Sequence, residues 1–168
     1  MDSEKGIETL KVWQKAMTFA FYIHQQVLPS LPVDEQWALS MQLRRSAQSI
    51  PANIAEGYGR YYYQEGIRFC YLARGSLEES FTYLSLAHEI GYLSKEVFTK
   101  TNEDIQELRR LINGYINYLK KNKRGENEAG SKNLIHENPS LYPSEFHQDI
   151  PGQNPSRAAP VEPEDQNS

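Results

Sequence analysis

The chain has 168 residues, with 18 Lys and Arg against 22 Asp and Glu and a mean hydropathy of −0.69, which indicates one soluble, mildly acidic domain with room for an appendage. No apolar run approaches the roughly 18 to 20 residues of a membrane helix, and the N-terminal segment lacks the basic and apolar regions of a secretory signal. The single cysteine, Cys70, excludes an intramolecular disulfide framework and a zinc site built from cysteines. We therefore expect a cytoplasmic protein that does not contact the membrane.

Charge and composition divide the chain at residue 124. Residues 1–124 carry 16 basic and 14 acidic side chains, a net charge of about +2, whereas residues 125–168 carry 2 basic and 8 acidic ones, about −6. Six of the nine prolines lie in this second part, and its few apolar side chains follow no helical or strand period. Such a segment does not offset the roughly 1–2 kcal/mol per residue of backbone ordering entropy. We expect a folded domain over 1–124 and a disordered, acidic, proline-rich tail over 125–168.

The first predicted helix covers residues 9–28. Thr9 is in position to cap its first turn, and Pro29 and Pro32 end it, because proline removes an amide donor and disfavours helical geometry in the preceding residue. The residues predicted to be buried recur at spacings of three and four along one face. They are Leu10, Trp13, Met17, Ala20, His24 and Val27.

The second predicted helix covers residues 35–57, with Asp34 as its cap and Glu35 in the first turn, where the helix dipole favours a negative charge. Pro51 lies inside this helix and costs roughly 3 kcal/mol in an exposed helix interior, since one carbonyl loses its usual partner. The apolar period stays in register across the proline, so we expect a kinked but continuous helix. Its predicted buried stripe is Leu43, Ala47, Ile50, Ile54 and Gly57.

After a connection at residues 57–59, a third helix is predicted over about 63–90 and a fourth over 95–124. Gly91 is in position to end the third helix, Ser94 to cap the fourth, and Gly125 to stop the fourth after a run of cations. The stripe of the third helix is Phe69, Leu72, Ser76, Ser80, Tyr83, Ala87 and Ile90, bordered by Ala73, Leu77 and Leu84. The stripe of the fourth is Val97 or Phe98, Thr101, Ile105, Leu108, Ile112, Tyr115 and Leu119. Four long helices with short turns bury such stripes against one another, which predicts an all-α, up-down-up-down antiparallel four-helix bundle.

Several segments carry a family resemblance. The most specific is SIPANIAEG at 49–57, and the others are LKVWQKA at 10–16, QLRRSA at 42–47, ARGSLEE at 73–79, LA at 86–87 and GYL at 91–93. Together they resemble the bacterial four-helix-bundle proteins that are often named 23S ribosomal RNA intervening-sequence proteins. The resemblance runs over about residues 7–123 and leaves the acidic tail outside it.

The resemblance implies a small all-α protomer that assembles into a ring-like homo-oligomer, a pentamer. Open reading frames of this family lie within insertions in ribosomal RNA genes. A more distant branch, the accessory variability determinant of diversity-generating retroelements, assists reverse transcriptases by binding RNA or DNA. The resemblance implies no enzymatic activity.

A polar stripe accompanies the apolar one on the second helix. Its members recur at spacings of three and four and are Gln42, Arg45, Ser49, Asn53, Glu56 and Arg60. One interpretation is a contact face for a ligand or nucleic acid. The other is a structural polar layer that satisfies donors and acceptors near Pro51, joined by Ser76 and Glu79 from the third helix.

The sequence offers little for catalysis or metal binding. A di-metal centre in a four-helix bundle needs Glu-x-x-His pairs on two helices, and no histidine here has a glutamate three residues before it. Cys70 lies between Phe69 and Tyr71 on a helix, which favours a buried packing role over that of a nucleophile. Gly57-x-Gly59 is too short for a phosphate-binding fingerprint. We predict no catalytic residue, no cofactor and no metal, and a protein that is not an enzyme.

Basic residues are spread over the predicted helices, and several are expected to converge on one surface. Arg60 is followed directly by Tyr61, Tyr62 and Tyr63, and cations beside aromatic rings are typical of proteins that bind RNA or single-stranded DNA. Alternatively, the tyrosines pack at a subunit interface and the arginines are solvated. The candidate nucleic-acid-binding residues are Arg44, Arg45, Arg60, Arg109, Arg110, Lys120, Lys121, Lys123 and Arg124.

Two functions follow from this reading. The first is a nucleic-acid-associated accessory protein, acting on RNA or with a reverse transcriptase, and the second is a protein-interaction scaffold that binds no nucleic acid. Salt separates them, because only phosphate binding weakens steeply with ionic strength. The charge split suggests in addition that tail carboxylates compete with nucleic acid for the basic surface, with a merely solubilising tail as the alternative.

Overall fold

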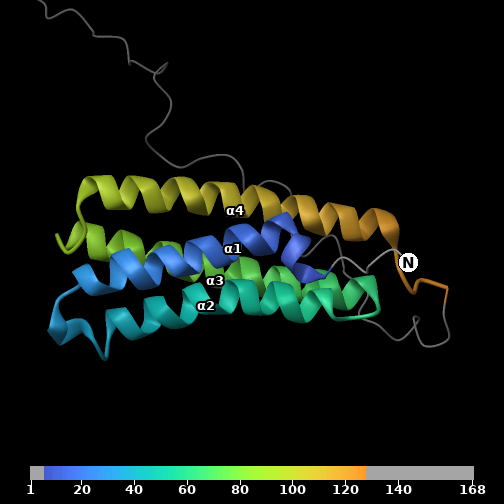
Figure 1. The fold of residues 1–168 in the computed structure, drawn as a ribbon, viewed down its shortest axis with the longest axis horizontal. Coiled ribbons are helices and arrows are strands. Elements are labelled where there is room, and N and C mark those ends of the chain that lie inside the picture. The colour runs from blue at the N-terminus through green and yellow to red at the C-terminus, as the bar shows by residue number, and fades with distance from the viewer. Residues whose placement is uncertain (1–5, 128–168) are drawn as a thin grey trace, which may run out of the picture. The chain divides into compact units, whose positions relative to one another are not determined.

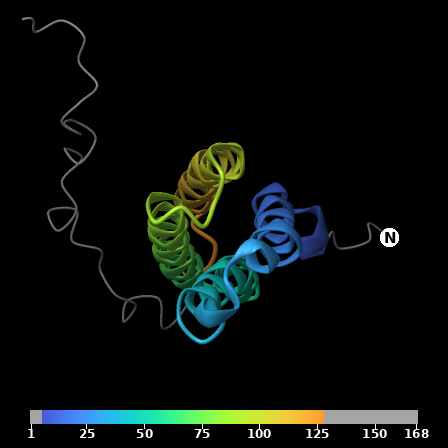
Figure 2. The ribbon, with the colours of Figure 1, turned by 90° about the vertical axis from the view of Figure 1, so that its left-hand side faces the viewer.

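Four long helices pack against their neighbours in chain order, each antiparallel to the one before (Figure 1). The computed structural model describes residues 6–127, and its helices are α1 (Lys11–Tyr22), α2 (Leu39–Tyr58), α3 (Tyr63–Glu89) and α4 (Lys95–Asn122). Seen along the bundle, the helices surround a common centre (Figure 2). The predicted all-α, up-down-up-down bundle is confirmed. Of the predicted disordered tail, residues 128–168 lie outside the described part of the chain.

The first helix differs from the prediction at its start. Thr9 does not cap α1, because it lies in a short 3₁₀ turn (Ile7–Thr9) and its hydroxyl donates to the Gly6 carbonyl at 2.9 Å. Leu10, with an extended backbone, occupies the cap position and offers no side-chain hydrogen bond. A π-helical turn (Ile23–Val27) follows α1, and a 3₁₀ turn that contains Pro29 (Leu28–Ser30) ends the helical segment close to the predicted position.

The buried face of α1 was predicted in part. Ala20 and Val27 are buried as predicted, and Leu10 and Trp13 pack against the core. Met17, however, is 44% exposed, and the core also takes Val12, Ala16, Phe19 and Ile23. Both stripes are apolar over most of their length, but the predicted one includes His24. Burying the observed stripe desolvates no polar side chain, and His24 stays partly exposed in this rotation of the helix.

The second helix is continuous through Pro51, and its predicted stripe from Leu43 to Gly57 is buried, as expected. Its start is four residues later than predicted. Asp34 is not the cap, because it lies in a 3₁₀ turn (Val33–Glu35). The Glu35 carboxylate instead accepts a hydrogen bond from the Leu39 amide at 3.2 Å.

The turn between α3 and α4 follows the prediction closely. Gly91 adopts φ +84°, its amide donates to the His88 carbonyl at 2.9 Å, and the Tyr92 amide donates to the Ala87 carbonyl at 2.8 Å. This is the paired hydrogen-bond pattern of a glycine-ended helix. The Ser94 hydroxyl then accepts from the Val97 amide at 3.3 Å and caps α4.

The buried stripes of α3 and α4 and the end of α4 differ from the prediction. Leu72 and Ile90 are exposed, because the buried stripe of α3 is centred on the residues predicted as its border, with Ile67 and Cys70 added. In α4, Ile116 is fully inside while Tyr115 and Leu119 are half-buried. The helix ends at Lys123, which takes the left-handed conformation with φ 45°, two residues before Gly125.

Small side chains let α2 and α3 approach closely. The Ser80 hydroxyl donates to that of Ser46 at 2.8 Å inside the core. A Cβ at Gly57 would lie 2.8 Å from the Phe69 Cβ, which shows how little space separates the two backbones. Across residues 6–127, no helix is long and apolar enough to cross a membrane.

Candidate nucleic-acid interface

Antiparallel packing brings the end of α2, the start of α3 and the end of α4 together at the right-hand end of the bundle in Figure 1. The Tyr63 amide donates to the Arg124 carbonyl at 3.1 Å and ties these segments together. We call this surface the basic end. It consists of Arg60, Tyr61, Tyr62, Lys120, Lys121, Lys123 and Arg124.

Cations at the basic end lie against aromatic rings. The Arg124 guanidinium is 4.8 Å from the centre of the Tyr61 ring, and that of Arg60 is 5.0 Å from the centre of the Phe69 ring. Tyr61 is 44% exposed and meets Tyr62 edge to face at 5.4 Å. Such a contact orients the cation and leaves the tyrosine ring partly accessible. A positive charge and an aromatic surface for stacking therefore lie next to each other.

A second cation and ring cluster continues from the basic end along α3 and α4. Tyr71 has the Arg74 guanidinium 5.0 Å and the Lys120 ammonium 5.9 Å from its ring centre. The Lys120 ammonium also donates to the Tyr71 hydroxyl at 3.3 Å, and Arg74 donates to the Asn113 side-chain oxygen at 3.2 Å. The basic surface therefore extends from the end of the bundle onto the α3–α4 face.

The structure does not bring every candidate cation to this surface. Arg44 and Arg45 are exposed on α2, and Arg110 is exposed in the middle of α4. Arg109 precedes Lys120 by eleven positions on α4, which is about 16 Å along the helix at 1.5 Å per residue. These four candidates lie outside the basic end.

Arg109 is engaged in holding two helices together. Its Nε and Nη2 donate to the two carboxylate oxygens of Glu78 at 2.8 and 2.7 Å, which joins α4 to α3. The hydrogen bonds to Glu78 raise the pKa of Arg109 further. A paired guanidinium of this kind is less available to a phosphate than an exposed one.

The polar stripe of α2 bonds mainly within the bundle. The Ser76 hydroxyl donates to that of Ser49 at 2.9 Å, and the Asn53 amide donates to the Ser49 carbonyl at 2.8 Å and hydroxyl at 2.9 Å. Glu56 forms an ion pair with Arg60 one turn later. Glu79 accepts from the Tyr83 hydroxyl at 3.3 Å on its own helix. Ser49, Asn53 and Ser76 are therefore hydrogen-bonded to one another between α2 and α3.

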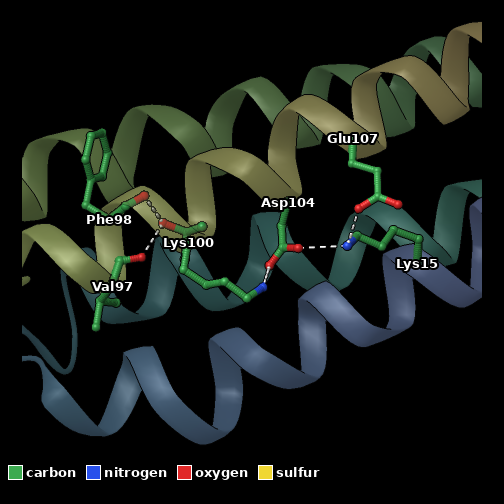
Figure 3. Close-up of polar contacts among 7 residues, drawn as sticks. Lys15, Val97, Phe98, Lys100, Asp104 and Glu107 are labelled. Atoms are coloured by element: carbon green, nitrogen blue, oxygen red, sulfur yellow. Dashed lines mark hydrogen bonds and ion pairs between the residues drawn. The ribbon is translucent and has the colours of Figure 1, made fainter.

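Sequence reasoning missed an ion network between α1 and α4 (Figure 3). Asp104, only 7% exposed, accepts from Lys15 at 2.7 Å and also pairs with Lys100, while Lys15 reaches Glu107 at 2.5 Å. Burial would raise the pKa of Asp104, but hydrogen bonds from Lys100 and Lys15 outweigh it and hold the pKa below its ordinary value. The sequence feature that could have indicated this network is the position of Asp104, which lies at helical spacings of three and four from the buried Thr101 and Leu108.

The described residues offer little for covalent chemistry. Burial raises the pKa of the Cys70 thiol to about 12, which suppresses the thiolate. His88 stacks on Phe98 at 4.5 Å, and His24 shares a hydrogen bond of 3.0 Å with Gln48. No group of three or more His, Cys, Asp or Glu within residues 6–127 is placed to hold a metal ion.

Comparison with known proteins adds a family and a fold. The family described as 23S rRNA-intervening sequence protein matches residues 8–114. A crystal structure from Bacteroides thetaiotaomicron, of a protein with unknown function from the S23 ribosomal protein family, is 29% identical, with a TM-score of 0.58, and the match covers 62% of this chain and 97% of that one. No curated protein matches the chain. The family match ends before Lys120, so the cations of α4 at the basic end lie beyond it.

Proposed function

Because the chain belongs to the 23S rRNA-intervening sequence protein family, we propose that it is a non-enzymatic accessory protein that binds single-stranded RNA through its basic end. The family description refers to an intervening sequence of ribosomal RNA, which supports a nucleic-acid partner. The high pKa of Cys70 supports the absence of a cysteine-based reaction.

The observation that carries the proposal is the pairing of Arg124 with Tyr61. A guanidinium neutralises a phosphate, and the adjacent ring stacks on an unpaired base. Lys120 and Tyr71 repeat this combination on the α3–α4 face. Stacking requires bases that are not already paired, so the arrangement favours a single strand or a loop over a duplex.

We also propose that the protein acts as a homo-oligomer, a pentamer by analogy with its family. Two exposed apolar side chains on consecutive turns of α1, Met17 and Phe21, support a subunit contact there. A ring of identical protomers multiplies the basic end, so that a long strand binds more tightly than one weak site allows.

A second candidate function is a protein-interaction scaffold for a partner such as a reverse transcriptase. It is favoured by the connection between α1 and α2, where Trp37 is 76% exposed. Large exposed aromatic side chains are frequent anchors of protein interfaces. In this case the protein would bind its partner without contacting phosphate.

The deciding experiment measures binding of a fluorescein-labelled single-stranded RNA of about 20 nucleotides by anisotropy over a series of salt concentrations. RNA binding predicts a linear fall of log K with log salt, with a slope that shrinks by about 0.7 for each cation removed in the double variant Lys120→Gln/Arg124→Gln. The matched control is Arg44→Gln/Arg45→Gln, two exposed cations outside the basic end, which should leave the slope nearly unchanged. Absence of salt-dependent binding at low ionic strength would favour the scaffold.

A further inference from the structure

Arg74 of α3 is a half-buried cation without a carboxylate partner. Its Nη1 donates to the Asn113 side-chain oxygen at 3.2 Å, and its guanidinium lies 5.0 Å from the centre of the Tyr71 ring. None of the ion pairs within residues 6–127 includes Arg74. A charge that is partly removed from water is normally matched by an anion or by several acceptors. The fold therefore leaves part of the binding capacity of this guanidinium unused.

The next guanidinium along the same two helices shows the usual arrangement. Arg109, one turn before Asn113 on α4, donates to both carboxylate oxygens of Glu78 at 2.8 and 2.7 Å. Its charge and its planar set of donors are thus both used inside the bundle. Arg74 and Asn113 lie one turn closer to the basic end, and a neutral amide there takes the place of the carboxylate.

Hydrogen bonds within this cluster use its acceptors and leave most donors of Arg74 and Asn113 available. The Asn113 oxygen accepts from Arg74, and the Tyr71 oxygen accepts from the Lys120 ammonium at 3.3 Å. Within the described part of the chain, Arg74 donates a single hydrogen bond, and the Asn113 amide nitrogen donates none. Both groups carry several N–H donors. A ligand that fits this cluster must therefore present acceptors.

Gly75, one turn after Tyr71 on α3, keeps the surface over Tyr71 open. It is exposed, and a Cβ at this position would meet nothing within 4 Å. Because side chains on a helix lean toward its N-terminus, a larger side chain here would cover the turn that carries Tyr71. Glycine leaves that turn accessible to a planar ligand.

We propose that Arg74 binds the O6 and N7 acceptors of an unpaired guanine, with Asn113 and Tyr71 fixing the orientation of the guanidinium. This inference rests on the proposed RNA-binding function and adds a base preference to it. Guanine presents two adjacent acceptors on this edge, which match two N–H groups of a guanidinium, whereas adenine and cytosine present an amino donor there. Lys120 and Arg74 both contact the Tyr71 ring, so a strand whose phosphate binds Lys120 has a neighbouring base at Arg74.

The test uses the full chain and fluorescein-labelled uridine strands of about 20 nucleotides that differ only in the central nucleotide. Measured by anisotropy, a central guanine should tighten binding by roughly five- to 150-fold over a central adenine or cytosine. A central 7-deazaguanine, which lacks N7, should lose most of this gain. A central hypoxanthine, which keeps O6 and N7 but lacks the 2-amino group, should retain it.

Two variants assign the preference to Arg74. Arg74→Lys keeps the charge but removes the planar set of donors, so it should bind the plain uridine strand almost normally and show no guanine preference. Asn113→Asp supplies the kind of carboxylate that Arg109 already has, which should engage Arg74 and abolish the preference while the two helices stay joined. Arg109→Lys is the matched control and should keep the preference, because its guanidinium is held by Glu78. Thermal unfolding followed by circular dichroism checks that each variant is folded.

The outcomes separate this inference from the proposed function. Equal affinity for the guanine, adenine and cytosine strands would overturn the inference and leave RNA binding intact, because phosphate contacts do not distinguish bases. A guanine preference that persists in both Arg74→Lys and Asn113→Asp would also overturn it. A smaller sedimentation coefficient for Arg74→Lys would assign the guanidinium to a carboxylate of a second copy of the chain, against the inference. If no strand binds even at low salt, the proposed function fails and the base preference fails with it.

Discussion

Lys15 of α1 and Asp104 of α4 form an ion pair of 2.7 Å that connects the first and last helices of the bundle (Figure 3). Asp104 is buried and also pairs with Lys100 on its own helix, whereas Lys15 extends to Glu107. Because a buried charge that loses its partner keeps its desolvation cost, this network makes the position of α1 sensitive to one carboxylate.

Replacing Asp104 by Asn should lower the free energy of unfolding by about 1–3 kcal/mol, because the buried end of the Lys15 interaction is lost. Urea denaturation at neutral pH measures this. Lys100→Gln is the control: its side chain is about half exposed, so the change should stay within about 0.5 kcal/mol. A larger loss for Lys100→Gln than for Asp104→Asn would contradict this account of the network.

The same network predicts a pH dependence. Hydrogen bonds from Lys100 and Lys15 hold the pKa of Asp104 below its ordinary value despite burial. A carboxyl with a lowered folded-state pKa stabilises the protein above its unfolded pKa of about 3.9, and that contribution is lost as the pH falls through the folded value. The stability difference between the unaltered chain and Asp104→Asn should therefore be constant near neutrality and shrink below about pH 4. A difference that grows on acidification would reverse the assigned sign.

Local sequence signals predicted those elements whose formation depends on nearby residues. Gly91 and Ser94 end and begin helices through hydrogen bonds to residues within a few positions, and the apolar period carries α2 through Pro51. The rotation of α1 was not predictable in this way, because two apolar stripes compete and only packing against the other helices selects one. The hydrogen bond from the Leu39 amide to the Glu35 carboxylate was not predictable either, because it depends on α2 beginning at Leu39, and the position of Pro32 in the sequence does not determine that start.

The candidate site likewise has features that the sequence predicts and features that only tertiary packing determines. Antiparallel order alone places Arg60 near Lys120 and Arg124, and the structure brings these residues together. It leaves Arg44 and Arg110 elsewhere, because position along a helix matters as much as which helix carries the cation. The Asp104 network was missed because an acidic residue in a buried stripe acquires its partners only from the tertiary structure.

The close approach of α2 and α3 predicts opposite effects of alanine at two glycines. Gly57→Ala should cost about 1–3 kcal/mol, because the new methyl group would lie 2.8 Å from the Phe69 Cβ and 3.0 Å from the Gly66 carbonyl. Gly75→Ala, with nothing within 4 Å of the new methyl group, should stabilise α3 by about 0.5–1 kcal/mol. Thermal unfolding of both variants checks this, and similar shifts at both positions would show that helix propensity alone governs them.

Cys70 should be unreactive in the folded protein. With its pKa raised to about 12 by burial, its thiolate fraction at pH 8 is roughly a thousandfold below that of an exposed cysteine. Labelling with a thiol reagent should therefore be slow in buffer and fast in concentrated urea. A cysteine introduced at the exposed Thr99 of the otherwise unaltered chain provides the rapid reference. Comparable native-state rates at the two positions would mean that the α3 core opens readily.

The stacking role of Tyr61 is separable from the charge of its neighbour. Tyr61→Phe keeps the ring beneath Arg124 and should retain RNA affinity, whereas Tyr61→Ala removes the stacking surface and should cost about 1–3 kcal/mol, or roughly five- to 150-fold in the dissociation constant. Because stacking is not ionic, the salt slope should remain nearly unchanged in Tyr61→Ala, unlike in the variant that lacks Lys120 and Arg124. Trp37→Ala, an exposed aromatic side chain at the opposite end of the bundle, is the matched control and should leave RNA affinity intact. If Tyr61→Phe and Tyr61→Ala weaken binding equally, the hydroxyl and not the ring is what the RNA contacts.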